Sequence, residues 1–215
     1  MKRAFSCLFA IALLMTFFAL CQTAFAEPAA TDEPTIYACG DYEYILLDDG
    51  TACITRWYSW ETDLTVADAL DGYVVTAIGD EAFSSCYSLT SITLPDSAVS
   101  IGSNIFQYCS SLREIVVPAD HPVFTIIDGV LFNKTDKRLV CYPAGLGASS
   151  YEVPDGITSI GDYSFYDCRN LTSVTLTDSV VSIGSNPFSR CSSLRNIVVS
   201  PDHPALATID GVLFY

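Results

Sequence analysis

Lysine and arginine are scarce in this chain, which carries 10 of them against 25 aspartates and glutamates, for a formal net charge of −15. Contacts with nucleic acid and with anionic membranes depend on Lys and Arg, so the composition argues against both partners. The excess of acid indicates solubility outside the cell. Acidic pairs such as Asp48-Asp49 lack the spacing of a calcium loop, and solvated charge explains them better. We expect no metal and no other cofactor.

Catalytic motifs are missing as well. The sequence has no Gly-x-Ser-x-Gly elbow, no Cys-x-x-Cys pair and no Cys/His cluster suited to zinc. Its two histidines, His121 and His203, recur at equivalent repeat positions, which favours a loop role between Asp and Pro over that of a catalytic base. Paired acids for glycoside hydrolysis stay an open alternative, because their spacing is spatial. We predict that the chain is not an enzyme.

A secretory signal peptide is predicted for residues 1–26. Lys2 and Arg3 precede an apolar run that is too short for a membrane span of roughly 20 residues, and Ala24-Phe25-Ala26 supplies a small-x-small cleavage site. A lipoprotein is the alternative reading of Cys21, but the preceding Leu20 is too large for that motif. Cleavage removes Lys2 and Arg3 and lowers the net charge to −17. Residues 27–36 read as a short flexible leader.

The sequence repeats on two length scales. Ile78-Gly79 through Phe83 and Cys86 returns 23 residues later at Ile101-Gly102, and both copies return after a further 82 residues, at Ile160-Gly161 and Ile183-Gly184. Repeats of 20–50 residues indicate a solenoid, in which each unit buries its apolar face against its neighbours.

Each 23-residue coil predicts a short strand, a turn and one or two short helical turns. Ala82, Phe83, Cys86 and Leu89 share a helical face, and Ile92 and Leu94 then alternate with polar residues as in a strand with one buried face. The glycine after each repeat Ile is expected where the backbone turns sharply. Residues 37–77 are expected to form an N-terminal β cap that contains a hairpin across Asp48-Asp49-Gly50.

Enlarged coils alternate with the ordinary ones. Between Asp120 and Ser159, Asp128-Gly129 lies between two apolar runs and predicts a hairpin, and the same text recurs from Asp202. We therefore assign residues 78–215 to a solenoid with an 82-residue super-repeat. Its second unit stops at Tyr215 inside a hairpin, from which we expect the chain to be a fragment of a longer protein.

Cysteines and aromatic residues have structural explanations. Cys86, Cys109, Cys168 and Cys191 occupy one repeat position and are expected to be buried thiols, which leaves Cys39–Cys53 as the one disulfide worth considering. Trp57, Tyr58 and Trp60 make the cap unusually aromatic. We favour rings that seal the end of the core, with an exposed binding platform as the alternative.

The motif Ile-Gly-x-x-Ala-Phe-x-x-Cys-x-x-Leu-x-x-Ile-x-Leu-Pro, nearly complete from Ile78 to Pro95, resembles the BspA-type (Treponema pallidum-type) leucine-rich repeats. Ile105, Ser164 and Pro187 replace its Ala, and Thr177 replaces its Pro. The resemblance covers about residues 40–215 and implies a curved leucine-rich-repeat solenoid on an exported bacterial protein. For that family it also implies surface display, adhesion to host matrix proteins and coaggregation with other bacteria.

Any ligand is expected to contact the solvent-facing strand positions, which stack in rows from coil to coil. These candidate positions are Ser91, Thr93, Glu114, Val116, Glu152, Ser173, Thr175, Asn196 and Val198. We predict a secreted or surface-displayed binding module whose partners are extracellular proteins or glycans, on host matrix or on other cells, with no membrane insertion in this segment. The alternatives are a structural spacer and the substrate-targeting module of a larger extracellular enzyme.

Overall fold

The computed structural model describes residues 34–209 and 212–214, all but Pro34 within one compact unit. Every regular element in this part is a strand, and no helix among these residues is long and apolar enough to cross a membrane. The expected signal peptide, residues 1–26, and residues 27–33 of the expected leader lie outside the described residues.

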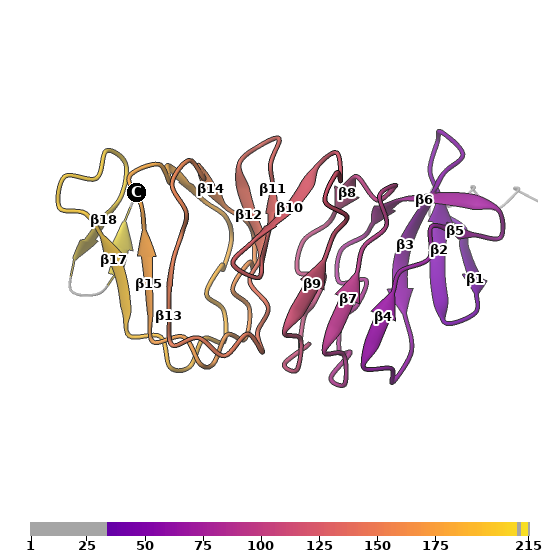
Figure 1. Cartoon of the computed structure of the whole chain (residues 1–215), viewed down its shortest axis with the longest axis horizontal. Coiled ribbons are helices and arrows are strands. Elements are labelled where there is room, and N and C mark those ends of the chain that lie inside the picture. The colour runs from indigo at the N-terminus through magenta and orange to yellow at the C-terminus, as the bar shows by residue number, and fades with distance from the viewer. Residues whose placement is uncertain (1–33, 210–211, 215) are drawn as a thin grey trace, which may run out of the picture. The chain divides into compact units, whose positions relative to one another are not determined.

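The strands follow one another in short lengths along the chain (Figure 1). Those up to residue 116 are β1 (Ile36–Cys39), β2 (Tyr42–Leu46), β3 (Ala52–Trp57), β4 (Asp63–Thr65), β5 (Ala69–Leu70), β6 (Tyr73–Ile78), β7 (Ser91–Thr93), β8 (Ser100–Ile101) and β9 (Glu114–Val116). The later ones are β10 (Phe124–Ile127), β11 (Val130–Asn133), β12 (Arg138–Cys141), β13 (Ser150–Glu152), β14 (Ser159–Ile160), β15 (Ser173–Leu176), β16 (Ser182–Ile183), β17 (Asn196–Val199), β18 (Ala207–Ile209) and β19 (Val212–Phe214).

An antiparallel meander opens the fold. Strands β1, β2 and β3 pair in sequence, and the β2–β3 hairpin closes across Asp48-Asp49-Gly50 as the turn residues predict. Strand β3 then pairs in parallel with β6, and β6 with β8, so the meander merges into the stacked coils without a break in hydrogen bonding.

Each coil has three sides. The long-strand face carries β4, β7 and β9 in one sheet and β13, β15 and β17 in another (Figure 1). The short-strand side carries β6 and β8, and later β12, β14 and β16. The turn side is the remaining segment of each coil, residues 79–90, 102–113, 161–172 and 184–195. Hydrogen bonds between residues 23 apart join successive coils, which confirms the predicted period.

The turn side is not helical, contrary to the prediction of short helical turns. Two residues in each coil have positive φ values of 49–66°, a region that a right-handed helix excludes. These residues are Glu81, Ser85, Asn104, Tyr108, Tyr163, Asp167, Asn186 and Arg190. Amides here donate to the next coil, as Phe83 N does to Ile105 O at 3.0 Å and Ser85 N to Gln107 O at 2.7 Å. The backbone therefore extends the ladder between coils, and a helix would have used the same donors internally.

The repeated glycines are needed for close approach of two coils. A Cβ built at Gly102 would lie 2.6 Å from Asp80 N, and one at Gly184 would lie 2.7 Å from Asp162 N. Neither glycine has a positive φ, so a sharp turn is not the reason for them. The close approach allows the Asp80 carboxylate to accept a hydrogen bond from Ser103 N at 2.6 Å, which links two coils.

A column of aromatic rings runs through the interior. Trp57 packs on Phe83, and Phe83 stacks on Phe106, with ring centroids 6.2 and 5.7 Å apart. A second column stacks Tyr142 on Phe165 and Phe165 on Phe188, at 5.4 and 5.1 Å. Thus Trp57 and Tyr142 occupy the place of the repeat Phe in the first coil and in the enlarged coil.

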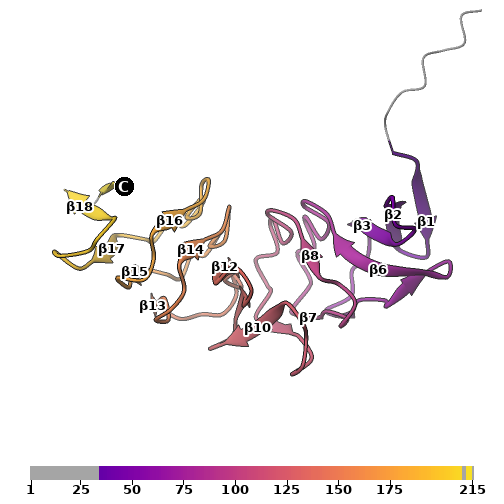
Figure 2. The same ribbon diagram turned by 90° about the horizontal axis from the view of Figure 1, so that it is seen from above.

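The hairpin β10–β11 lies between two apolar cores, and we call it the hairpin wall. The first core extends from Tyr44 to Leu131, and the second from Val130 to Leu206. Strand β11 supplies both, because Leu131 belongs to the first core whereas Val130 and Phe132 belong to the second. The hairpin β10–β11 turns at Asp128-Gly129 as predicted, and the view in Figure 2 shows β10 and β12 between the two groups of coils.

Candidate ligand-binding face

The long-strand face presents its outward side chains in register. Alternation along these strands turns the central residue inward and its two neighbours outward. Ile92 in β7 and Ile115 in β9 are buried in this way, whereas Tyr151 in β13 and Ile197 in β17 are partly buried. One group of rows is Asp63–Ser91–Glu114 and Thr65–Thr93–Val116. The other is Ser150–Ser173–Asn196 and Glu152–Thr175–Val198. All nine candidate residues lie in these rows.

Three further row members were missed from the sequence: Asp63, Thr65 and Ser150. Asp63-Leu64-Thr65 carries the same polar–apolar–polar alternation as Ser91-Ile92-Thr93, and that alternation is the signal that would have found it. The offset between them is 28 residues rather than 23, which hid the correspondence.

Hydroxyl and carboxylate groups dominate the rows. Ser91 Oγ donates to Glu114 Oε2 at 3.4 Å across neighbouring coils. Thr62 Oγ1 donates to Asp63 Oδ2 at 2.7 Å, and Thr90 Oγ1 reaches Asp63 Oδ1 at 3.5 Å. Val116 and Val198 add apolar surface and are 37% and 45% exposed. The face therefore combines hydrogen-bond acceptors, hydroxyls and small apolar patches.

The aromatic cap residues divide between the two expected roles. Trp57 is 3% exposed and heads the aromatic column, so it seals the core as predicted. Trp60 and Tyr58 are 81% and 55% exposed, so the sealing interpretation is wrong for these two rings. Trp60 lies three residues before Asp63, near the first row of the face, and Arg56 lies over the Tyr58 ring at 5.7 Å.

The two histidines organise loops. His121 is fully buried, and its Nδ1 accepts hydrogen bonds from Val123 N at 3.2 Å and Phe124 N at 3.0 Å. His203 makes the same pair of contacts with Ala205 N and Leu206 N, at 3.1 and 3.0 Å. Equivalent histidines thus satisfy the amides of equivalent loops, which is the loop role expected from the repeat.

All seven cysteines of the described residues are free thiols, and these residues contain no group of three metal-ligating side chains. Burial raises the pKa of the Cys141 thiol to about 12, and a hydrogen bond that Cys109 donates to Cys86, together with burial, raises the pKa of Cys109. Cys109 Sγ donates to Phe83 O at 3.0 Å. Such protonated, enclosed thiols are inert packing groups at neutral pH.

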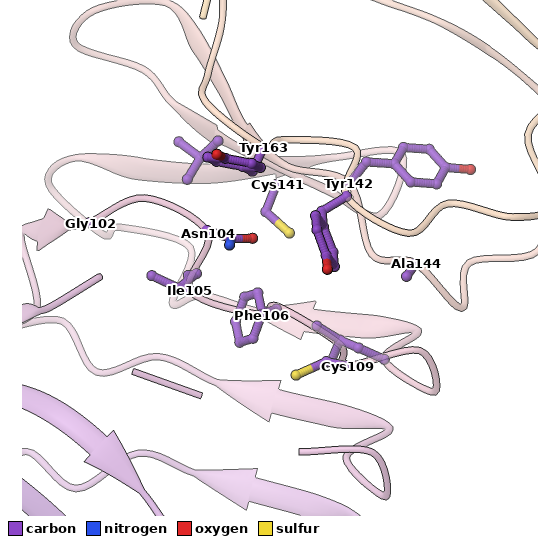
Figure 3. A pocket seen from close by; sticks show the side chains of 12 residues that line it. Gly102, Asn104, Ile105, Phe106, Cys109, Cys141, Tyr142, Ala144 and Tyr163 are labelled. Atoms are coloured by element: carbon purple, nitrogen blue, oxygen red, sulfur yellow. The ribbon is translucent and has the colours of Figure 1, made fainter. Parts of the chain in front are cut away.

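A small cavity lies at the junction of the two cores. Asn104, Phe106, Cys141 and Tyr142 line it, and its volume of about 20 Å³ is close to that of one water molecule (Figure 3). Asn104 Oδ1 and Tyr142 OH are buried here without a protein partner, and a water between them would satisfy both. Such a cavity is too small for an organic ligand.

The comparisons with known proteins agree with this geometry. A family model described as "BspA type Leucine rich repeat region" matches residues 71–145 and 141–215, in six copies. No curated protein is significantly similar to the chain.

Several solved structures are similar. The pneumococcal vaccine antigen PcpA is 16% identical over 78% of this chain and 71% of its own, with a TM-score of 0.50, which shows a shared fold. A leucine-rich cell surface protein of Faecalibacterium prausnitzii A2-165 is 22% identical over 80% and 78%, with a TM-score of 0.45. The leucine-rich repeat protein TpLRR of T. pallidum is 20% identical over 76% and 71%, with a TM-score of 0.43.

Proposed function

We propose, from the premise that this chain belongs to the BspA-type leucine-rich-repeat family, that its long-strand face binds extracellular proteins or glycans. The repeat fold itself suits protein binding, because stacked coils present an extended surface that no single coil could offer. Export by the predicted signal peptide, and adhesion to host matrix or to other cells, are part of this proposal.

The observation that carries the proposal is the register of the rows. Ser91, Glu114 and their equivalents stand side by side along neighbouring strands, so each coil presents outward side chains at the same two positions as the one before it. A ligand with its own repeat could engage several coils together. Weak contacts at each coil would then add through effective concentration, which raises total affinity without any deep pocket.

Substitutions on and off the face test the proposal. Changing both Val116 and Val198 to Lys places two long, positively charged side chains in the rows. The matched control changes Val99 and Val181 to Lys, because these valines are 43% and 53% exposed but lie outside the rows. We expect the row variant to lose at least ten-fold in binding to whichever purified matrix protein or neutral glycan on an array retains the wild-type chain. The control should bind as the wild type does.

Two results would count against the binding face. Equal loss in the row variant and the control would place the contact elsewhere. Absence of any retention on the array, with a chain that is folded by circular dichroism, would favour the structural spacer over a binding module.

A further inference from the structure

A second polar cluster lies on the turn side, away from the rows. Asp167, Arg169, Arg190 and Ser192 line a hollow of about 400 Å³ that is open to solvent. Because the hollow is shallow and only four residues line it, much of this volume is open space above the surface. The hollow joins the third and fourth repeat copies, because Asp167 and Arg169 belong to one and Arg190 and Ser192 to the next.

The buried carboxylate of Asp167 contacts both arginines. Its side chain is 3% exposed, and its Oδ1 lies 2.8 Å from Arg169 Nε and 4.0 Å from Arg190 Nε. The side chains of Arg169 and Arg190 remain 60% and 50% exposed. The Nε atoms of both guanidinium groups lie nearest the buried carboxylate, which leaves the terminal N–H groups of Arg169, and those of Arg190 that no tyrosine binds, for the hollow.

Two tyrosines, Tyr108 and Tyr166, also contact the Arg190 side chain. Arg190 Nη1 donates to Tyr108 OH at 3.2 Å, and its guanidinium carbon lies 5.0 Å from the centre of the Tyr108 ring. Tyr108 in turn packs edge-on against Tyr166, with centroids 5.5 Å apart. A hydrogen bond with Tyr166 raises the pKa of Arg190, so this guanidinium is firmly charged. Both arginines are thus preorganised before any ligand arrives.

Two guanidinium groups share a single carboxylate, so the hollow carries one positive charge in excess. That local sign is opposite to the net charge of the whole chain, which is −15. The coil itself does not require these arginines. Positions equivalent to Arg190 hold Ser85 and Tyr108 in the first two coils, and those equivalent to Arg169 hold Tyr87 and Ser110.

We propose that this hollow binds an acidic sugar through its carboxylate. Terminal N–H groups of Arg169 and Arg190 would pair with the two carboxylate oxygens, in the charge-assisted geometry that guanidinium groups favour. Ser192, which lines the hollow beside the arginines, would supply a hydrogen bond to a ring hydroxyl. A polar rim of this kind suits a sugar, whereas a peptide carboxylate would gain little from it.

The site stands apart from the long-strand face and does not depend on the proposed function. A structural brace, in which the arginines serve only to join coils, is the competing explanation. The brace requires the contacts with Asp167 and Tyr108 but predicts no ligand.

Titration of the chain with tetragalacturonate, followed by NMR or calorimetry at low salt, tests the proposal. The fully methyl-esterified tetrasaccharide is the matched ligand, because it keeps the rings and removes the charge. We expect millimolar binding of the acid and at least ten-fold weaker binding of the ester. R169A and R190A should each weaken binding of the acid at least ten-fold, and R190K several-fold, because an ammonium lacks the planar fork. R195A, an exposed arginine of the same coil, should change nothing.

Thermal unfolding of each variant separates loss of binding from loss of fold, and R169A leaves the Tyr108 contacts intact. Equal binding of acid and ester, or unchanged binding in R169A and R190A, would overturn the proposal. So would the absence of binding by the folded wild type. Tetraglutamate bound as tightly as the sugar would overturn its glycan specificity. None of these outcomes bears on the row variants above.

Discussion

The buried His121 accepts hydrogen bonds from backbone N–H groups of its own loop and does not face solvent. The amides of Val123 and Phe124 both need an acceptor inside the loop, and His121 Nδ1 supplies it for both. The ring also packs on Phe124, with centroids 5.2 Å apart. The loop role of the histidine could be predicted from the sequence, because the same residue recurs at the equivalent position of the next unit and equivalent positions in a repeat have the same backbone neighbours. The identity of the two amides could not, because it depends on how the loop folds back.

His121→Ala should destabilise the protein by about 2–4 kcal/mol, since the buried Phe124 N–H and the half-buried Val123 N–H both lose their acceptor. His121→Asn should recover part of the loss, because its side-chain oxygen can take the position of Nδ1. Urea unfolding monitored by circular dichroism measures both values. If the two variants were equally destabilised, ring packing rather than hydrogen bonding would explain the effect.

At the scale of elements, the strands could be predicted from the sequence and the turn side could not. Alternating residues such as Ile92 and Leu94 have one explanation, a half-buried strand, and the structure confirms it. The spacing of Ala82, Phe83 and Cys86 fits a helical face equally well as a series of turns around a core. Hydrogen bonding to the next coil decides between them, and no local pattern reveals it. For the same reason most of the outward row positions could be predicted, although Asp63, Thr65 and Ser150 were missed. The Arg169–Arg190 hollow could not be predicted, because it depends on contacts between coils.

Glu81→Asn should stabilise the protein by about 0.5–1 kcal/mol. Glu81 has a φ of 55°, a conformation that costs most residues about 1–2 kcal/mol but that Asn adopts more readily. Asn104 and Asn186 already occupy the equivalent positions. Glu81→Ala is the control and should bring no gain, because its Cβ meets the same backbone. A comparable shift in the urea midpoint for Ala would show that loss of charge, rather than backbone strain, was responsible.

At the largest scale, the described part of the chain is a stack of coils divided by a hairpin wall. Strand β11 places Leu131 in the first core and Val130 and Phe132 in the second. The 82-residue super-repeat in the sequence predicted that enlarged coils alternate with ordinary ones. It did not predict that the enlarged coil closes two cores at once, because both faces of β11 are apolar and the sequence does not say which neighbour each face meets.

Adjacent substitutions in β11 should therefore loosen different ends of the stack. Leu131→Ala should lower amide-exchange protection mainly in coils before the hairpin, and Phe132→Ala mainly in coils after it. Each should cost about 2–5 kcal/mol, the range for large-to-small changes in a core. Hydrogen exchange read by mass spectrometry resolves the two ends. An identical loss throughout the described chain in both variants would mean that the wall does not separate the cores energetically.

The hairpin wall also affects how a repeat protein of this kind can gain or lose units by duplication or deletion. Because β11 is apolar on both sides and the sequence of its hairpin recurs 82 residues later, a block that runs from one such hairpin sequence to the next would leave both of its neighbours covered wherever it is inserted. Duplication or loss of a complete 82-residue block would therefore keep every coil in contact with the kind of partner it had before. Removal of part of a wall would instead expose one core. Among natural variants of this chain, we accordingly expect length polymorphism in steps of one block, with crossovers placed at matching positions of neighbouring units.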